Sequence, residues 1–182
     1  MSKIIRYQKW GIKYKIKRGS WLFVWYTLFR PTPKMLGKNW RNFLLKLYGC
    51  KISGEALVCS SVRILEPWNL IIGNYVAIGK GVNIYNHCLV TIGNNVVISQ
   101  DTELCTSSHN YSLNSMPLIY SPIIVEDNVW ITTKCFIHPG VKINTGAVIG
   151  ACSVVTSNVE EWSINAGNPC KFIKRRVFDY DK

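Results

Sequence analysis

Three histidines are the side chains of this sequence best suited to proton transfer near neutral pH. They are His87, His109 and His138. His109 is the strongest candidate for a general base, because it lies where a regular repeat gives way to an insertion at residues 110–124. An insertion of that length beside a polar residue is typical of a lid or of the wall of a site. A base there is suited to remove the proton of a hydroxyl group, which is a poor nucleophile at neutral pH.

The elements that must position this histidine are predicted by an aliphatic residue at every sixth position. Fifteen residues follow this spacing within four blocks, and all are Ile, Leu or Val: Ile52, Val58 and Ile64; Ile72, Ile78 and Ile84; Ile92, Ile98 and Leu104; and Val125, Ile131, Ile137, Ile143, Ile149 and Val155. A period of six fits neither an α-helix nor a long strand. Each unit is therefore predicted to be a short strand followed by a turn, with three units to one coil.

A mostly small residue stands two positions before the next aliphatic residue. Examples are Ala56, Val62, Val76, Val82, Cys88, Val96, Thr102, Ser108, Val129, Cys135, Val141, Ala147 and Ser153. Residues two apart in a strand share a face, so both side chains of each pair are expected to point inward. Stacked coils would pair as parallel strands around a prism filled with Ile and Val. Trp68 breaks the small-residue pattern, and we expect it to cover an end of the prism or to point out at a corner.

Glycine or asparagine follows many of the aliphatic residues, namely at Gly73, Gly79, Gly93, Asn144 and Gly150. These residue types suit a corner where the backbone bends or adopts a positive φ.

The positive charge of the chain is concentrated in its first 51 residues. They contain thirteen Lys or Arg and no Asp or Glu, whereas residues 52–182 contain nine basic and ten acidic residues. We predict a basic, aromatic helical segment at 1–50, a β-helix at 51–160 with its loop at 110–124, and an extension at 161–182. The first segment is suited to an anionic membrane surface, or to packing as an amphipathic helix on the domain. Nucleic acid is the weaker alternative, since the sequence has no nucleic-acid-binding motif.

Other features of the sequence indicate a chain that stays in the cytoplasm. The apolar run 21–29 is about half as long as a membrane-spanning helix. It is followed by Arg-Pro-Thr-Pro rather than by the small residues of a signal-peptide cleavage site. The seven cysteines are odd in number and lack a C-x-x-C pair, so we expect reduced thiols in the core.

Several motifs make the chain similar to a known family. They are Glu66-Pro67-Trp68-Asn69-Leu70, Ile84-Tyr85-Asn86, Thr91-Ile92-Gly93, the stretch from Leu104 to Tyr111, Val129-Trp130-Ile131 and Ala166-Gly167-Asn168-Pro169. Together with the repeat they resemble the hexapeptide-repeat acyltransferases, and among these the colanic acid biosynthesis acetyltransferases, relatives of the galactoside, maltose and nodulation-factor O-acetyltransferases. The resemblance implies a mainly β fold, a left-handed parallel β-helix with short N-terminal helices, usually as a homotrimer. It also implies acetyl transfer from acetyl-CoA to a sugar hydroxyl in surface polysaccharide biosynthesis, without a metal ion.

The resemblance implies a role for each residue that matches the family's motifs. His109 corresponds to the general base, and Asn86, His87 and Tyr111 to acceptor contacts. Acetyl-CoA contacts are implied for Trp130, Thr133, Ala151, Thr156, Ser157, Lys171 and Lys174. For Asn86 a corner turn held by its own side chain is the alternative, and for Lys171 and Lys174 a solvated basic tail. His87 stands where relatives often have a carboxylate, which leaves the acceptor open, and a lipid-linked glycan at the inner membrane face is one candidate.

Other functions on the same fold stay open. An amino-sugar N-acetyltransferase or a drug-modifying acetyltransferase would share the base and the cofactor. A zinc enzyme of the γ-carbonic anhydrase type would use His87, His109 and His138, which the repeat assigns to one face of the prism. A scaffold that only forms trimers would use none of them.

Overall fold

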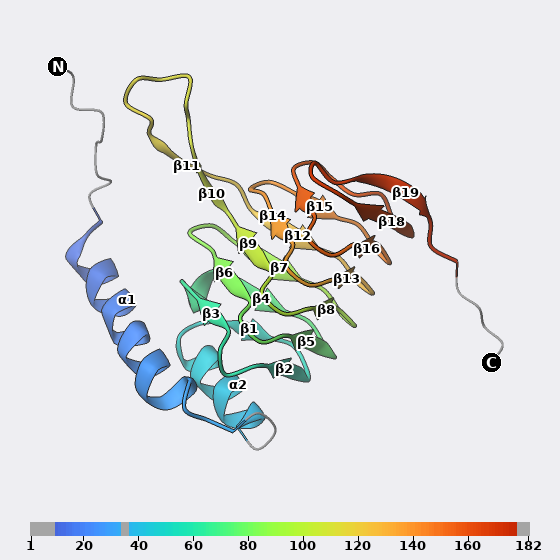
Figure 1. Cartoon of the computed structure of the whole chain (residues 1–182). Helices are drawn as coiled ribbons and strands as arrows, with labels where there is room; N and C mark the ends of the chain where they lie inside the picture. The colour runs from blue at the N-terminus through green and yellow to red at the C-terminus, as the bar shows by residue number, and fades with distance from the viewer. Residues whose placement is uncertain (1–9, 34–36, 178–182) are drawn as a thin grey trace.

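The computed structural model describes residues 10–33 and 37–177, whose strands form a β-helix with helices at its N-terminal end (Figure 1). The helical elements are α1 (Ile12–Val24), the π-helical turn η1 (Trp25–Phe29), α2 (Lys38–Leu47) and the 3-10 turn η2 (Pro67–Asn69). Three sheets form the sides of the prism, and their strands pair in parallel except for β19. The mainly β fold with short N-terminal helices is thus confirmed.

Each coil contributes one short strand to each sheet. Sheet A consists of β1 (Lys51–Ile52), β4 (Leu70–Ile72), β7 (Val90–Ile92), β12 (Ile123–Val125) and β15 (Lys142–Ile143). Sheet B consists of β2 (Ala56–Val58), β5 (Val76–Ile78), β8 (Val97–Ile98), β13 (Trp130–Ile131), β16 (Val148–Ile149), β18 (Ser163–Ala166) and β19 (Lys171–Arg175). Sheet C consists of β3 (Arg63–Ile64), β6 (Asn83–Tyr85), β9 (Glu103–Cys105), β14 (Phe136–Ile137) and β17 (Val154–Val155). A separate hairpin is formed by β10 (Ser107–His109) and β11 (Leu118–Tyr120).

The interior of the prism is filled as the six-residue period predicts. All fifteen aliphatic residues of the series are buried. In β2, Ala56 and Val58 point inward and Leu57 between them is partly exposed, which is the alternation expected of a strand. The coils stack in register, so that Ile72 pairs with Ile92 in the next coil. Like side chains therefore lie above one another along the axis.

The corners differ from the prediction in where the backbone turns left-handed. Positive φ angles occur at Tyr75 and Gly81, two residues beyond Gly73 and Gly79. Those two glycines are required by close packing instead: a Cβ at Gly73 would lie 2.5 Å from the carbonyl oxygen of Gly93, and one at Gly79 would lie 2.9 Å from the backbone nitrogen of Gln100. The turn of one coil thus lies directly on the backbone of the next.

The insertion is an antiparallel hairpin that projects from the corner between sheets C and A (Figure 1). The predicted inward position of Ser108 is wrong: its side chain is exposed, because the chain leaves the prism at this corner and Ser108 belongs to β10. The chain re-enters the prism at Ile123, which is buried and pairs with Val90. The excursion thus ends slightly before the predicted boundary at 124.

The two helices cover one edge and the N-terminal end of the prism (Figure 1). On α1 and η1, the buried residues Trp21, Trp25 and Phe29 are spaced four apart and so form one face. The indole N–H groups of Trp21 and Trp25 donate to the carbonyls of Ile64 and Val62, at 2.7 and 2.8 Å. Trp68 lies at a corner in η2, with its ring against Tyr14 and under the ammonium group of Lys17. None of the described helices has the length and apolar character that crossing a bilayer requires.

Arg41 fixes α2 to the prism. Its side chain is fully buried. Nε donates to the Val58 carbonyl at 2.7 Å, and Nη1 donates to Thr32 Oγ1 at 2.7 Å and to the Pro33 carbonyl at 2.8 Å. One planar guanidinium therefore joins β2, α2 and the segment between the two helices. This basic residue of the N-terminal segment is structural.

Arg41→Lys should destabilise the protein, because an ammonium group cannot reach three acceptors that a guanidinium fork spans. We expect the free energy of unfolding to fall by about 2 kcal/mol, measured by urea denaturation. Lys46→Arg, on the exposed side of the same helix, is the matched control and should leave the midpoint unchanged. Equal stability of Arg41→Lys and the native chain would contradict this role.

Candidate functional site

His109 is positioned by the hairpin. It is the last residue of β10 and pairs with Leu118 of β11. The connecting turn is held by the N–H of Asn110, which donates to the Pro117 carbonyl at 2.9 Å. The N–H of Ser112 donates to the side-chain oxygen of Asn110 at 3.1 Å, an Asx turn that the residue type favours.

The ring of His109 is oriented by a single backbone contact. Its Nδ1 lies 2.6 Å from the carbonyl oxygen of Met116. A carbonyl can only accept a hydrogen bond, so Nδ1 carries the proton. In the neutral ring the lone pair then resides on Nε2. The side chain is exposed, so a basic nitrogen is available to a bound hydroxyl group.

A second histidine is held inside the molecule by a carboxylate. His87 Nδ1 lies 2.8 Å from Glu66 Oε1, and both side chains are almost completely buried. Glu66 also accepts hydrogen bonds from the Tyr14 hydroxyl of α1 and from Asn69 Nδ2, the latter at 2.8 Å. This cluster, Glu66, His87, Tyr14 and Asn69, is called the Glu66 cluster below.

The Glu66 cluster changes the proton affinity of two of its members. Burial raises the pKa of Glu66, but the hydrogen bonds from His87 and Tyr14 outweigh burial and hold the pKa below its ordinary value. The pKa of the Tyr14 phenol is raised, first by burial and then by its hydrogen bond to Glu66. Glu66 is therefore ionised and Tyr14 protonated at neutral pH.

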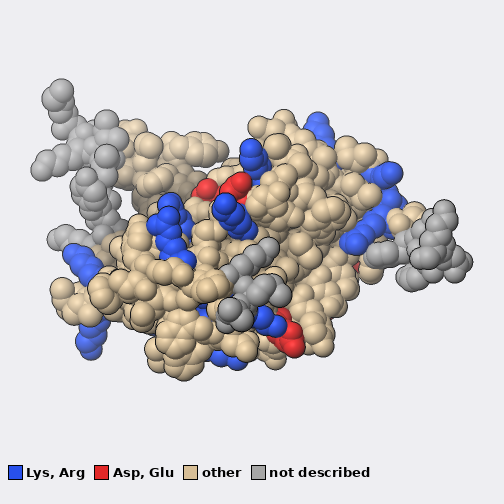
Figure 2. All heavy atoms as spheres, turned by 60° about the horizontal axis from the view of Figure 1, so that its bottom comes forward, with Lys and Arg blue, Asp and Glu red and all other residues tan. Residues whose placement is uncertain are grey.

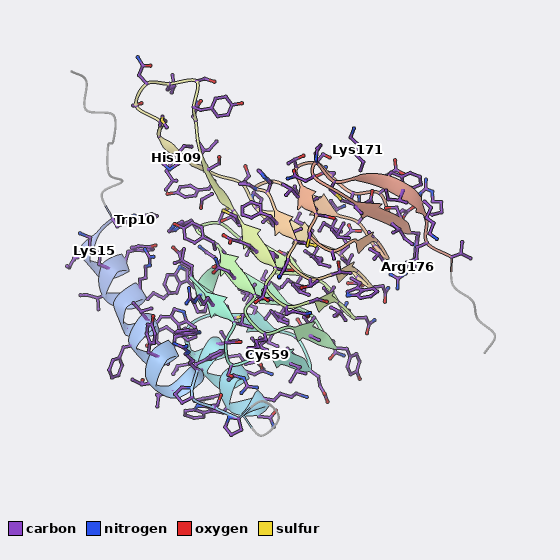
Figure 3. All side chains as sticks on the ribbon, viewed as in Figure 1. Trp10, Lys15, Cys59, His109, Lys171 and Arg176 are labelled. Atoms are coloured by element: carbon purple, nitrogen blue, oxygen red, sulfur yellow. The ribbon has the colours of Figure 1, made fainter. Side chains whose placement is uncertain are left out.

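Aromatic rings connect the Glu66 cluster with the hairpin. The ring of His87 stacks on Trp10 at 5.3 Å and lies 5.6 Å from the ring of Tyr120. Tyr120 pairs with Ser107 in the hairpin, so it shares a hairpin face with His109 two residues along. Figure 3 shows His109 on the hairpin above Trp10, which lies just before α1. The two histidines thus border the same region.

The other two predicted acceptor contacts differ in their surroundings. Asn86 is buried: its Oδ1 accepts from the Glu66 N–H at 3.0 Å, and its Nδ2 donates to the carbonyls of Glu66 and Asn69 at 2.8 and 3.0 Å. Its amide holds this corner, as the alternative interpretation expected, and an acceptor contact by Asn86 stays a prediction. Tyr111 is 88% exposed at the tip of the hairpin, away from the Glu66 cluster.

Most of the predicted acetyl-CoA residues lie on sheet B or at its corner with sheet C. Trp130, Val148, Ile164 and Lys174 pair in sequence across four neighbouring strands, which puts them in one row. The indole N–H of Trp130 donates to Ser99 Oγ at 3.1 Å. At the corner, Thr133 donates its hydroxyl to the Gln100 carbonyl, and Ala151 is exposed in the next coil. Lys171 is exposed on β19, where it pairs with Ala166.

The remaining two lie elsewhere. Thr156 and Ser157 are exposed just after β17, at the corner between sheets C and A from which the hairpin with His109 also projects. A single chain therefore divides the predicted residues between two edges of the prism.

The zinc alternative finds little support within one chain. His87, His109 and His138 all follow strands of sheet C, as the repeat indicated. Within residues 10–33 and 37–177, however, no group of three or more His, Cys, Asp or Glu side chains could hold a metal ion. His87 is instead paired with Glu66.

Sequence reasoning missed the carboxylate behind His87. The motif that contains Glu66 predicts no role for it, and Tyr14 and Trp10 have no predicted role in the site either. A usable signal exists, because Glu66 is an acidic residue within a strongly apolar repeat, and it lies between Ile64 and Ile72, where the spacing of the aliphatic series lengthens from six to eight. A buried carboxylate there needs donors, and a neighbouring histidine is one.

Comparisons with known proteins agree with this architecture. No protein-family model matches the chain. It is 38% identical over 162 residues to the Escherichia coli K12 protein assigned to colanic acid biosynthesis as the acetyltransferase WcaF, covering 89% of this chain and 88% of that protein. It is 33% identical over 175 residues to the galactoside O-acetyltransferase of the same organism, covering 94% and 84%. The fold matches that of a hexapeptide-repeat acetyltransferase from Vibrio cholerae, solved with acetyl-CoA, at a TM-score of 0.83 and 23% identity over 98% of this chain and all of that one.

Glu66→Gln should destabilise the native chain by about 2–4 kcal/mol at pH 7, because it removes a buried charge that organises several donors. The lowered pKa of Glu66 fixes the sign of the pH dependence. Its contribution is complete above the unfolded-state pKa of about 4.3, and it is lost as the pH falls through the lower folded-state value.

Urea denaturation of both proteins between pH 7 and pH 3 measures this difference, which should shrink toward the acid end. Glu55→Gln is the matched control, since Glu55 is an exposed carboxylate paired with Lys38 and should contribute little. A pH-independent difference for Glu66→Gln would show that the carboxylate's charge is not the cause.

Proposed function

The chain belongs to the hexapeptide-repeat acetyltransferases and is an acetyltransferase, and from this premise we propose that it transfers an acetyl group from acetyl-CoA to a sugar hydroxyl. The sugar belongs to a surface polysaccharide under assembly, and a lipid-linked intermediate is the form of it we favour. The names of the two relatives support a sugar acceptor. The observation that carries the chemistry is the contact between His109 Nδ1 and the Met116 carbonyl.

That contact prepares His109 for one task. Nε2 accepts the proton of the sugar hydroxyl while the hydroxyl oxygen forms a bond to the thioester carbonyl carbon. The Nδ1–H bond to Met116 stabilises the imidazolium that results. When the tetrahedral species collapses, the carbon–sulfur bond breaks and Nε2 returns the proton to the departing thiolate. The reaction needs no covalent intermediate on the protein.

The Glu66 cluster serves the acceptor. Glu66 accepts from Nδ1 of His87, which leaves Nε2 of His87 for a hydroxyl group of the sugar. Trp10 and Tyr120 supply aromatic surface beside it. Asn86 and Tyr111 remain proposed acceptor contacts, Asn86 through the corner that it holds. The role of His87 is therefore to orient the acceptor, while His109 performs the proton transfer.

His109→Ala should lower kcat by about 10²–10⁴-fold, the contribution of a general base, with acetyl-CoA binding unchanged. Thioester consumption is measured with simple sugars, nucleotide sugars and lipid-linked glycans as acceptors. His138→Ala is the comparison variant, because His138 is the third histidine, directly follows β14 of sheet C and has no role in the proposed proton transfer. Full activity of His109→Ala would exclude it as the base, and zinc-dependent turnover that also needs His138 would favour the metal alternative.

We also propose that the enzyme is a homotrimer with acetyl-CoA bound between subunits. One wall of this acetyl-CoA groove is formed by residues of one subunit, namely Trp130, Thr133, Ala151, Lys171 and Lys174. Thr156 and Ser157, on the hairpin corner of the neighbouring subunit, form the other wall. Lysine ammonium groups meet the phosphates as point charges, so we expect weaker binding than bidentate arginines would provide.

The trimer predicts complementation between two inactive chains. His109→Ala and Lys171→Ala/Lys174→Ala chains are coexpressed and assayed below the KM for acetyl-CoA. Random mixing of the two chains leaves about one quarter of the sites with both functional halves, since each half is intact with a probability of one half. Recovery of that activity, together with a sedimentation mass of about three times 20.8 kDa, is the expected result. A monomer, or no recovery above the separate variants, would contradict the shared site.

A further inference from the structure

The outer face of α1 carries a second apolar stripe, opposite the one that packs on the prism. Ile12, Ile16 and Phe23 lie on the side of the helix away from Trp21 and Trp25, and Ile12 and Phe23 are 69% and 68% exposed. Their spacing of four and seven residues keeps them on one face. Three large apolar side chains are thus held in water on a well-formed helix.

The outer face of α2 repeats this arrangement at the N-terminal end of the prism. Trp40, Phe43 and Leu47 are exposed, Leu47 by 66%, while Leu44 and Leu45 face the prism. Trp40 links the two helices: its indole N–H donates to the Leu28 carbonyl at 2.9 Å, and its ring stacks on Phe43.

Within residues 1–51, all the charged side chains around these apolar stripes are positive. Lys13, Lys15 and Lys46 are exposed beside them, and residues 1–51 contain no Asp or Glu. Two acidic side chains from outside the segment pair with the helices: Glu66, which is buried beneath α1 and accepts from Tyr14, and Glu55, which Lys38 holds at 2.8 Å. On the face seen in Figure 2, Lys and Arg side chains are spread over the helical end and acidic side chains show at few places.

We propose that the outer faces of α1 and α2 dock on the surface of an anionic lipid bilayer. They comprise Ile12, Ile16 and Phe23 on α1 and Trp40, Phe43 and Leu47 on α2, with the neighbouring lysines. Apolar and aromatic side chains enter the interface while lysines meet the headgroups. A second copy of the same face would be repelled by its like charge. A nucleic acid would attract the lysines but would leave the aliphatic stripe in water.

Docking there would deliver the active-site side of the molecule to lipid-linked substrates. Trp10 begins the same helical segment and stacks on His87, so α1 runs from the proposed acceptor region to the docking face. This consequence rests on the proposed function, whereas the docking itself is measured without any turnover.

Flotation of the full chain with vesicles tests the proposal. Vesicles of phosphatidylcholine with phosphatidylglycerol should carry the native protein, and vesicles of phosphatidylcholine alone should not. Phe23→Ser/Phe43→Ser/Leu47→Ser should lower the partition coefficient by about tenfold or more. Lys13→Gln/Lys15→Gln/Lys46→Gln keeps the apolar face and should cause a loss of similar size that disappears at high salt.

The matched control is Phe172→Ser/Ile173→Ser. These two exposed apolar residues lie among Lys171, Lys174 and Arg175 at the other end of the chain, and they should not affect flotation. Thermal melting checks that each variant folds. If the Phe23/Phe43/Leu47 variant does not fold, the Lys13/Lys15/Lys46 variant still tests the proposal.

Four outcomes would overturn the proposal. One is equal flotation of the native protein and the variants altered on α1 and α2, and another is a loss of flotation with the Phe172/Ile173 variant instead. The third is a fall in the sedimentation mass of the apolar helical variant, which would assign this face to contacts between copies. Failure of the native chain to float, with retention of RNA under the same conditions, would assign the lysines to nucleic acid.

Discussion

The inward side chain of every sixth residue is the constraint on which this structure depends. The strands are two or three residues long for most of the prism, too short to be stable alone. Each is held by parallel pairing to the coils above and below and by an Ile, Leu or Val that fills the shared interior. A polar group inside needs a hydrogen-bond partner, and the buried hydroxyls of Thr102 and Ser153 find theirs in the backbone carbonyls of Thr132 and Gly150. The interior is therefore mostly aliphatic, and most of the chemical variety lies at corners, outer faces and ends.

The candidate site follows from that confinement. His109 lies on a hairpin at a corner, where the chain leaves the stack after Thr106 and returns at Ile123 without disturbing the pairing of β7 with β12. Glu66 and His87 lie at the same corner in earlier coils, and α1 covers them. Covering a corner with a helix creates a buried polar environment that the prism alone cannot form. The coils hold the corner in place, the hairpin carries His109, and α1 covers the pair of Glu66 and His87.

The fold was predictable from the sequence because the six-residue period recurs in every coil, and each recurrence indicates an aliphatic side chain that points inward. The position of His109 on an excursion from the prism was predictable for the opposite reason, since it lies where the period breaks. The link between Tyr14 and Glu66 was not predictable, because it joins residues 52 apart across the boundary between helix and prism. No period spans that boundary. The structural role of Arg41 was not predictable. It is one of thirteen basic residues in the first 51, and nothing in the sequence distinguishes the one whose guanidinium is buried against β2.

The distribution of the predicted acetyl-CoA residues over two edges of the prism is the reason for which we propose assembly. In that proposal, acetyl-CoA binds in a groove where two prisms meet. The row from Trp130 to Lys174 spans the four C-terminal strands of sheet B, whereas the hairpin projects from the corner between the other two sheets. In the proposed trimer, the hairpin corner of a neighbouring subunit closes over that row. Assembly and catalysis would then be two consequences of one geometry, and the helical end would stay free for a different surface.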